Sequence, residues 1–271
     1  MSAGKRVLVV GGARGIGRGV VERFARLGAH VVICDTDRLP NAFNQYRSAQ
    51  AGGAAEAERL AAALQADGLS VRAHAADASS EIEIAALYDA IAREHGALDV
   101  VVNAHGVTHV SPVETMTLDA FRAIVDGNLV GTFLSCRSAI PLLRRAGGGA
   151  IVNVASVSGR QGFGKVAHYC AAKFGVVGFT SALAQELARD RIRVNAICPG
   201  IVRTAMWEYL LDEFTRPGET REACWQRMCA MIPQGEPQTP DDVAEVIVMI
   251  AGAARVTGQA ISVDGGMHVA P

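Results

Sequence analysis

No run of apolar residues in this sequence reaches the roughly 18 that a membrane-spanning helix needs. The first residues pass from a short polar lead into an apolar run without the cleavage pattern of a secretory signal, so we expect a cytoplasmic protein. Neither sign of charge is in excess, since 26 Lys and Arg stand against 27 Asp and Glu, for a formal net charge of −1. This balance gives no reason to expect a nucleic-acid or membrane partner.

The cysteines lack the spacing that zinc sites and redox motifs use. No Cys-x-x-Cys pair occurs among the six, which are Cys34, Cys136, Cys170, Cys198, Cys224 and Cys229. The last two lie close in sequence, but no other cysteine or His-x-His cluster near them completes a zinc site. We therefore expect reduced thiols and no bound metal.

Short apolar, β-branched runs alternate with Ala- and Leu-rich helical stretches along the whole chain. The strand-like runs cover residues 6–10, 30–34, 69–74, 98–103, 150–156, 192–198 and 259–264. Several are apolar almost throughout, which is typical of parallel strands that are covered on both faces. The alternation predicts an α/β fold in which helices flank a doubly wound, seven-stranded parallel sheet. No repeat or linker divides residues 1–271, so we expect one domain.

Two segments depart from the alternation. Residues 37–53 form a long connection where a short one would do, and long irregular connections tend to be functional or mobile. Residues 204–240 carry both tryptophans and read as two short helices broken at Pro217-Gly218. This second segment follows the sixth strand on the side where such sheets bind ligands, so we expect a helical cover over a substrate site. A packed helical excursion without function is the alternative.

A glycine-rich turn, Gly11-x-x-x-Gly15-x-Gly17, follows the first strand and opens a helical stretch. Glycine permits close backbone approach to a pyrophosphate, and the start of a helix presents free N–H groups to it. Asp35 comes one strand later, at the end of "HVVICD". Strand, turn, helix and acid together predict a dinucleotide site.

The acid at position 35 favours NAD over NADP. A carboxylate there can accept both ribose hydroxyls of NAD, and it repels a 2′-phosphate. Arg14 and Arg38 argue the other way, because a guanidinium near that ribose could pair with the extra phosphate. We expect NAD to be the cofactor.

Lysine is scarce, and one of the three lysines, Lys173, follows Tyr169 by four residues in "AHYCAAKFG". This spacing places the two side chains on one face of a helix. Because a nearby ammonium favours phenolate, Lys173 is expected to lower the pKa of the phenol from its usual value of about 10, which suits an acid/base beside a nicotinamide. Taken alone, the pair also fits a packed tyrosine and a lysine whose ammonium reaches solvent.

Further polar residues stand where the same crevice would place them. Ser156 ends the strand "AIVNVAS", so its hydroxyl can bond a substrate oxygen. Asn128 interrupts a long helical pattern with an amide that could hold a water in line with Lys173. Thr204 follows the Pro199-Gly200 stop after the sixth strand.

Together these motifs resemble the short-chain dehydrogenase/reductase family over nearly the whole chain, from the glycine turn to "SVDGGM". The resemblance implies a single Rossmann-type domain, NAD(P)-dependent hydride transfer and a homotetramer. By matching motifs, Tyr169 would be the acid/base, Lys173 would hold the nicotinamide ribose, Ser156 would stabilise the substrate oxygen, and Asn128 would anchor the water of a proton relay. The implied cofactor contacts are Gly11, Arg14, Gly15, Ile16 and Gly17 for the pyrophosphate, Asp35 for the adenosine ribose, Asp77 and Ala78 for adenine, Asn103 for the ribose region, and Ile201, Val202 and Thr204 for the carboxamide.

The chain departs from the family at a few positions. "NAHG" at 103–106 replaces Asn-Asn-Ala-Gly, so Ala104 drops an amide and His105 brings a bulkier group. His105 is either a packing change or a catalytic group, and an acid/base is already assigned. Val10 replaces a threonine that stabilises the glycine turn.

The substrate class stays open between a secondary alcohol oxidised with NAD and a 3-oxoacyl or ketone group reduced with NADPH. Residues 204–207 and the helices after them are similar to bacterial polyol and vicinal-diol dehydrogenases. Phe163, His168, Met206 and Trp207 would form a mostly apolar wall, which also fits hydroxysteroids or aryl alcohols. A non-catalytic dinucleotide sensor is the competing class, although it has no need for Ser156, Tyr169 and Lys173 together.

Overall fold

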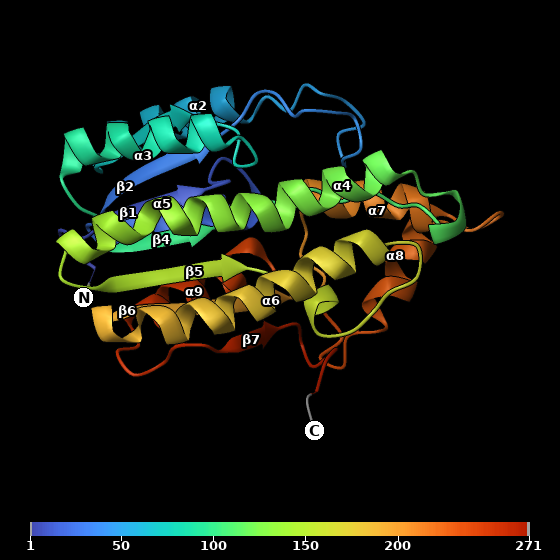
Figure 1. Cartoon of the computed structure of the whole chain (residues 1–271). Helices are drawn as coiled ribbons and strands as arrows, with labels where there is room; N and C mark the ends of the chain where they lie inside the picture. The colour runs from blue at the N-terminus through green and yellow to red at the C-terminus, as the bar shows by residue number, and fades with distance from the viewer. Residues whose placement is uncertain (1, 270–271) are drawn as a thin grey trace.

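The computed structural model describes residues 2–269. Its strands form one parallel seven-stranded sheet in the order β3-β2-β1-β4-β5-β6-β7 (Figure 1). The strands are β1 (Arg6–Val10), β2 (His30–Asp35), β3 (Val71–Ala75), β4 (Val100–Asn103), β5 (Gly149–Val154), β6 (Ile192–Pro199) and β7 (Ala260–Val263). All seven predicted strands are confirmed, with ends that differ by one or two residues. The order reverses beside β1, which makes the carboxyl ends of β1 and β4 a switch point where such sheets bind ligands.

Helices cover both faces of the sheet (Figure 1). One face packs against α1 (Gly15–Arg26), α2 (Gly53–Ala66) and α9 (Pro240–Gly252). The other packs against α3 (Glu81–His95), α5 (Gly131–Arg145) and α6 (Ala167–Leu187). The predicted doubly wound α/β architecture is therefore confirmed as one Rossmann-like domain.

Three further helices lie toward the carboxyl ends of the strands (Figure 1). They are α4 (Leu118–Val125), α7 (Ala205–Phe214) and α8 (Arg221–Cys229). The predicted break at Pro217-Gly218 falls between α7 and α8. One π-helical turn, Asp126–Val130, joins α4 to α5, and short 3-10 turns cover Val113–Thr115, Val157–Gly159 and Ala188–Asp190.

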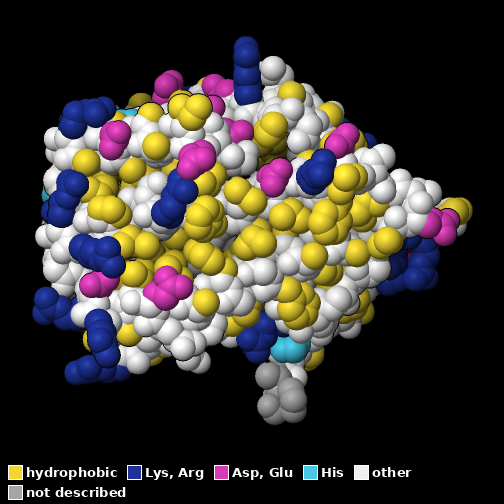
Figure 2. Space-filling model, in the orientation of Figure 1, with side chains coloured by type: hydrophobic (Ala, Val, Ile, Leu, Met, Phe, Trp, Pro, Cys, Tyr) yellow, Lys and Arg dark blue, Asp and Glu magenta, His cyan; other side chains and the backbone are white. Residues whose placement is uncertain are grey.

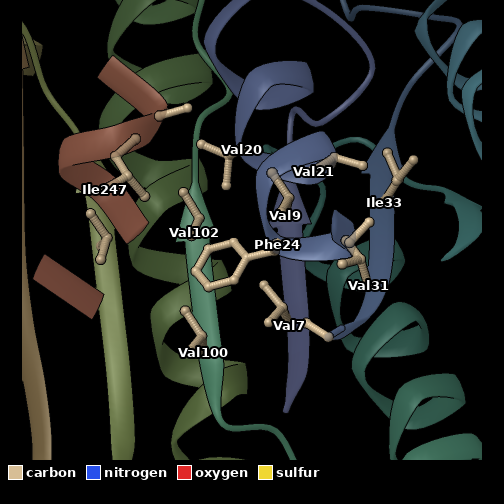
Figure 3. Packing of buried hydrophobic residues seen from close by; sticks show 14 of the residues in the cluster. Val7, Val9, Val20, Val21, Phe24, Val31, Ile33, Val100, Val102 and Ile247 are labelled. Carbon is tan, nitrogen blue, oxygen red and sulfur yellow. The ribbon is translucent and has the colours of Figure 1, made fainter. Parts of the chain in front are cut away.

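Alternate residues of the central strands supply two separate cores, because both faces of the sheet are covered. Val7 and Val9 of β1 belong to the core beneath α1, whereas Leu8 of the same strand packs on the opposite face. Phe24 of α1 lies over Val7 and the β4 valines in the first core (Figure 3). Burying each such side chain stabilises the fold by about 1.5–3 kcal/mol, which fixes α1 and the turn before it against the sheet.

Residues 36–52, between β2 and α2, form an extended irregular segment that we call the strap. Its two arms pair through a single antiparallel bridge between Arg38 and Gln50. Its tip, drawn in blue, reaches over toward α4 and α7 (Figure 1). The long connection predicted at residues 37–53 is thus present and lies at the ligand-binding end of the sheet.

Within residues 2–269, no helix combines the length and the hydropathy needed to cross a membrane. In the same range, no three or more His, Cys, Asp or Glu side chains gather as metal ligands would. The six cysteines are buried and free of disulfides.

Candidate active site

One large cavity, of about 860 Å³, opens at the carboxyl ends of the strands and extends under the strap and α7. Most of the residues expected at a cofactor or substrate site line it, namely Gly11, Arg14, Gly15, Ile16, Asp35, Asp77, Ala78, Ser156, Tyr169, Lys173, Ile201, Val202 and Thr204. Four expected residues, Gly17, Asn103, Asn128 and His168, do not line it. The volume lies in the upper part of the range that ligand sites occupy.

The glycine turn forms because only glycine fits where the backbone segments touch. Gly11 has φ of +78°, and a Cβ on it would lie 2.5 Å from His105 Cα. A Cβ on Gly17 would lie 2.0 Å from the Gly11 carbonyl oxygen, so Gly17 closes the turn from behind instead of facing the cavity. Helix α1 begins at Gly15 without a side-chain cap, which leaves its first N–H groups for an anion.

Asp35 ends β2 at the rim of the cavity. Its carboxylate accepts hydrogen bonds from the backbone N–H groups of Ala13 (3.0 Å) and Thr36 (2.9 Å). Burial raises the pKa of Asp35, and these two N–H groups oppose the shift. The carboxylate thereby ties the end of β2 to the glycine turn while one side of it faces the cavity.

Arg14 is engaged by the strap. Its guanidinium donates to the carbonyl oxygens of Ala51 (2.9 Å) and Gly52 (2.8 Å). It also lies 5.8 Å from the centre of the Tyr46 ring. The guanidinium that the sequence offers as a partner for a 2′-phosphate is thus held by the protein's own backbone.

Tyr169 and Lys173 lie one turn apart on α6, and Ser156 follows β5 opposite them. The Lys173 ammonium is 5.5 Å from the centre of the Tyr169 ring and donates to the Val154 carbonyl oxygen at 2.9 Å. Lys173 is only 3% exposed, and burial lowers its pKa to about 8. The Ser156 hydroxyl accepts a hydrogen bond from Ser158 N–H (3.1 Å), which fixes its direction.

The expectation that Tyr169 has a lowered pKa is wrong for this structure. Burial raises the pKa of Tyr169 to about 12, while the neighbouring Ser156 hydroxyl acts in the opposite direction. The physical reason is that the phenol lies in a largely apolar place, with its hydroxyl 3.9 Å from Met206 Sδ. The ammonium of Lys173 faces the Val154 carbonyl, and desolvation outweighs its attraction for a phenolate.

Asn128 lies in the π-helical turn, in agreement with the interruption that the sequence indicates. Its amide N–H group donates to the carbonyl oxygens of Val107 and Ile124, both at 2.8 Å. Among the described residues, its buried Oδ1 has no hydrogen-bond partner. A Cβ on Gly106 would lie 2.7 Å from this oxygen and 3.3 Å from Lys173 Nζ, so glycine keeps the space between the two groups open.

Asn103 takes a structural place, not the expected one beside a ribose. It is 1% exposed and pairs with its register neighbour Asn153 through Nδ2 and Oδ1 at 2.8 Å. Its own Oδ1 accepts from Ser135 Oγ (2.6 Å), and Asn153 donates to Thr180 Oγ1 (2.9 Å). These amides therefore join β4 and β5 to α5 and α6, on the face of the sheet that these two helices cover.

Two histidines close to the site have different surroundings. His105 lines the cavity, where burial lowers its pKa to about 3 and keeps the imidazole neutral. His168, expected in the apolar wall, does not line the cavity. It is fully buried behind Tyr169, with its ring centre 5.9 Å from that of His109. Neighbouring positions on α6 point about 100° apart, so His168 faces the interior when Tyr169 faces the cavity.

The strap contacts α7 and the loop after β4 in ways that the sequence did not indicate. Arg47 pairs with Glu213 (2.8 Å) and lies over the Tyr209 ring at 5.1 Å. The Tyr209 hydroxyl accepts from Val110 N–H at 3.0 Å, and Gln45 Oε1 accepts from the N–H of Thr108 at 3.1 Å. Only the unusual length of the segment set it apart in the sequence, since pairs far apart in sequence carry no local pattern.

Comparison with known proteins gives one family and several full-length relatives. Residues 11–268 match the family model described as enoyl-(acyl carrier protein) reductase. The chain is 34% identical to D-threitol dehydrogenase of Mycolicibacterium smegmatis over 98% of this chain and 94% of that protein. It is 33% identical to a 3-oxoacyl-(acyl-carrier-protein) reductase of Chlamydia muridarum, over 97% of both chains.

Galactitol 2-dehydrogenase of Agrobacterium fabrum is 32% identical over 97% of this chain and 96% of its own length. The crystal structure of gox2181 superimposes with a TM-score of 0.85 at 27% identity, covering 98% of this chain and 96% of that chain. The relatives therefore share the whole domain, while their names cover both polyol oxidation and ketoacyl reduction.

Proposed function

The chain belongs to the short-chain dehydrogenase/reductase family, and from that premise we propose that it transfers hydride between NAD and a secondary alcohol or its ketone. The observation that carries the proposal is one cavity that is lined both by the glycine turn and by Ser156, Tyr169 and Lys173. In this family, a bound dinucleotide places its nicotinamide ring beside a set of Ser, Tyr and Lys side chains of this kind. NADPH-dependent reduction of a 3-oxoacyl or ketone substrate is the second candidate, favoured by the reductase relatives.

The residues present fit a nicotinamide dinucleotide. Helix α1 begins at Gly15 without a side-chain cap, so its first N–H groups are free for a pyrophosphate. Asp77 and Ala78 after β3 and Thr204 after β6 line the same cavity. Bound there, the dinucleotide would supply the hydride acceptor. The protein would supply the proton acceptor and the orientation of the alcohol.

Two observations support NAD over NADP. Asp35 presents a carboxylate at the end of β2, where it would repel a 2′-phosphate. Arg14, which could offset that repulsion, already donates to the carbonyl oxygens of Ala51 and Gly52. Using it for a phosphate would leave two strap carbonyls without their partners.

The chemistry assigned to the side chains is a single proton transfer at the Tyr169 hydroxyl. With its pKa raised to about 12, Tyr169 holds its proton at neutral pH and would donate it to a ketone as hydride arrives. In the reverse direction it would pass its own proton to the relay water and take the alcohol proton as hydride leaves the adjacent carbon. Ser156 donates a hydrogen bond to the reacting oxygen. Lys173 places a positive charge near the phenol, and the space between Lys173 and Asn128 Oδ1 suits a water that relays the proton.

The test is the formation of NADH from secondary alcohols, run beside the same reactions with NADP. We expect Tyr169→Phe to keep dinucleotide binding and to lose turnover by about 100-fold or more. Tyr88→Phe is the matched control, because Tyr88 is a buried tyrosine of α3 that does not line the cavity. Near-native turnover by Tyr169→Phe would show that another group transfers the proton. Dinucleotide binding without turnover of any alcohol or ketone would favour the sensor.

We also propose a homotetramer. Large apolar side chains stay exposed on α4, α5 and α6, including Phe121 (40%), Phe133 (40%) and Phe174 (46%). In Figure 2 a broad yellow area covers the middle of this face, over the helices that Figure 1 draws in green and yellow. An apolar surface of this kind marks an interface with another protein surface. A second copy of this chain is the occupant that the family resemblance implies.

A further inference from the structure

We propose that the substrate is a bulky apolar alcohol of the alicyclic class and not a polyol or a carrier-bound acyl chain. The inference rests on the proposed function and narrows its substrate. It depends on the wall of the cavity that α7, α8 and the segments around them build beside Tyr169. We call this surface the apolar wall.

The apolar wall begins at the reacting hydroxyl. Met206 Sδ lies 3.9 Å from the Tyr169 hydroxyl oxygen. The side chains that continue the wall away from it are apolar and come from α7, α8, the loop before α6 and the C-terminal turn; they include Phe163, Trp207, Phe214, Met228, Met231 and Met267. A substrate whose reactive carbon lies at Tyr169 therefore has its remaining atoms against methionine sulfurs and apolar side chains.

Two polar side chains near this wall, Arg227 and Thr204, already have protein partners. Arg227 lines the cavity but forms two hydrogen bonds with Glu219, of 2.8 and 2.9 Å, and a third with the Phe214 carbonyl oxygen. The Thr204 hydroxyl donates to the Val202 carbonyl oxygen at 3.2 Å. A polyol would lose the water around its several hydroxyl groups here and gain few partners in return.

Apart from Arg227, the charged residues that line the same cavity lie on other elements. Asp35 ends β2 and Asp77 follows β3, while Asp119, Arg122 and Asp126 belong to α4 and the π-helical turn. The arginines of α8 offer little to an acidic carrier protein. Arg221 pairs with Glu208 (2.7 Å) and Asp212 (3.3 Å), and Arg227 pairs with Glu219. A carrier protein that docked on α8 would have to break these pairs.

Methionine sets the shape that the wall can accept. Its side chain is flexible and its sulfur polarizable, so several methionines together adjust to an irregular hydrocarbon surface. Trp207 is more rigid because its ring packs edge-on against Trp225, with centres 6.2 Å apart. A cavity wall with one flat, rigid side chain and several flexible methionines suits a compact saturated ring better than an extended flexible chain.

The experiment measures binding separately from turnover. Cyclohexanone, 4-tert-butylcyclohexanone, threitol and galactitol would be titrated calorimetrically into the Tyr169→Phe variant saturated with NADH for the ketones and NAD for the polyols, because these mixtures would react in the parent enzyme. Turnover by the parent enzyme is assayed separately. We expect the two alicyclic ketones to bind at least about tenfold more tightly than either polyol, with the larger ketone the tighter. Tighter binding of a polyol would overturn the inference and leave the proposed function standing. Tight binding of the alicyclic ketones without any turnover would support the inference and contradict the proposed function.

A matched pair of variants tests the wall itself. Met231 lines the cavity and is 46% exposed, so Met231→Gln replaces apolar contact with an amide at a position that tolerates a polar group. We expect about tenfold weaker binding of 4-tert-butylcyclohexanone. Met249→Gln makes the same change on α9 at a position that is 60% exposed and does not line the cavity, and its affinity should equal that of the parent. Equal affinity in the Met231 variant would show that the ligand does not lie against this wall.

Discussion

Replacing Lys173 with methionine is expected to stabilise the protein at neutral pH while removing its activity. The ammonium is buried, with one hydrogen bond to the Val154 carbonyl oxygen, and its pKa falls from the ordinary 10.5 to about 8. That difference corresponds to about 3 kcal/mol by which folding disfavours the charged lysine. Methionine has similar length without charge, so Lys173→Met should gain most of this free energy of unfolding, less about 1 kcal/mol for the unpaired carbonyl.

The sign and the pH window follow from the two pKa values. Between the folded value of about 8 and the unfolded value of 10.5, the unfolded chain holds the proton more tightly, so the stability of the parent rises with pH. Below pH 8 the full penalty is present. The charge-related advantage of Lys173→Met should therefore shrink from about 3 kcal/mol at pH 7 to about 1.5 kcal/mol at pH 9.5.

Urea unfolding at fixed protein concentration, repeated from pH 6.5 to 9.5, measures this difference. Lys165→Met is the control, because Lys165 is exposed and its replacement should give a difference that does not change with pH. The reasoning would be refuted by a Lys173→Met stability difference that stays constant across the range. That result would mean that the pKa of Lys173 in the folded protein equals its unfolded value, as for a solvated lysine.

Three further predictions concern the turn, the cofactor and the assembly. Gly17→Ala should abolish dinucleotide binding, because its Cβ would lie 2.0 Å from the Gly11 carbonyl oxygen. The control Gly252→Ala places a Cβ with no atom within 4 Å and should bind normally. Calorimetric titration with NAD distinguishes the two variants. Asp35→Asn should lower the ratio of the NADP to the NAD dissociation constant by about tenfold, while Arg14→Ala leaves it unchanged because the strap already holds that guanidinium. Phe174→Glu should reduce the mass measured by light scattering, and Ile82→Glu, at an 82% exposed site on α3, should not.

The sheet was predictable because its signal is local. Each strand is a short β-branched run, so residues 6–10 of the sequence and β1 of the structure coincide. The turn after β1 was equally readable, since three glycines at fixed spacing satisfy a steric need that their own neighbourhood creates. The helices after β6 and the break at Pro217-Gly218 also follow from local pattern.

The parts of the site that escaped prediction depend on three-dimensional surroundings. Asn103 ends a strand like a ligand contact, yet its direction is set by Asn153, 50 positions later. The pKa of Tyr169 was expected to fall because its helix neighbour is a lysine, but burial by distant segments decides it. The pairing of Arg47 with Glu213 joins residues 166 positions apart, and nothing local in the sequence links them.

The paired amides of Asn103 and Asn153 fix how β4 aligns with β5 in the middle of the sheet. Asn103 and Asn153 stand side by side in parallel strands. Sliding β4 by one position against its neighbours would turn the Asn103 amide outward into the hydrocarbon layer beneath α1 and α9. Each amide stranded in this way would cost about 1–3 kcal/mol, a large share of the margin that keeps a domain folded. These two polar side chains therefore fix the alignment of the strands. The valines alone would allow several alignments.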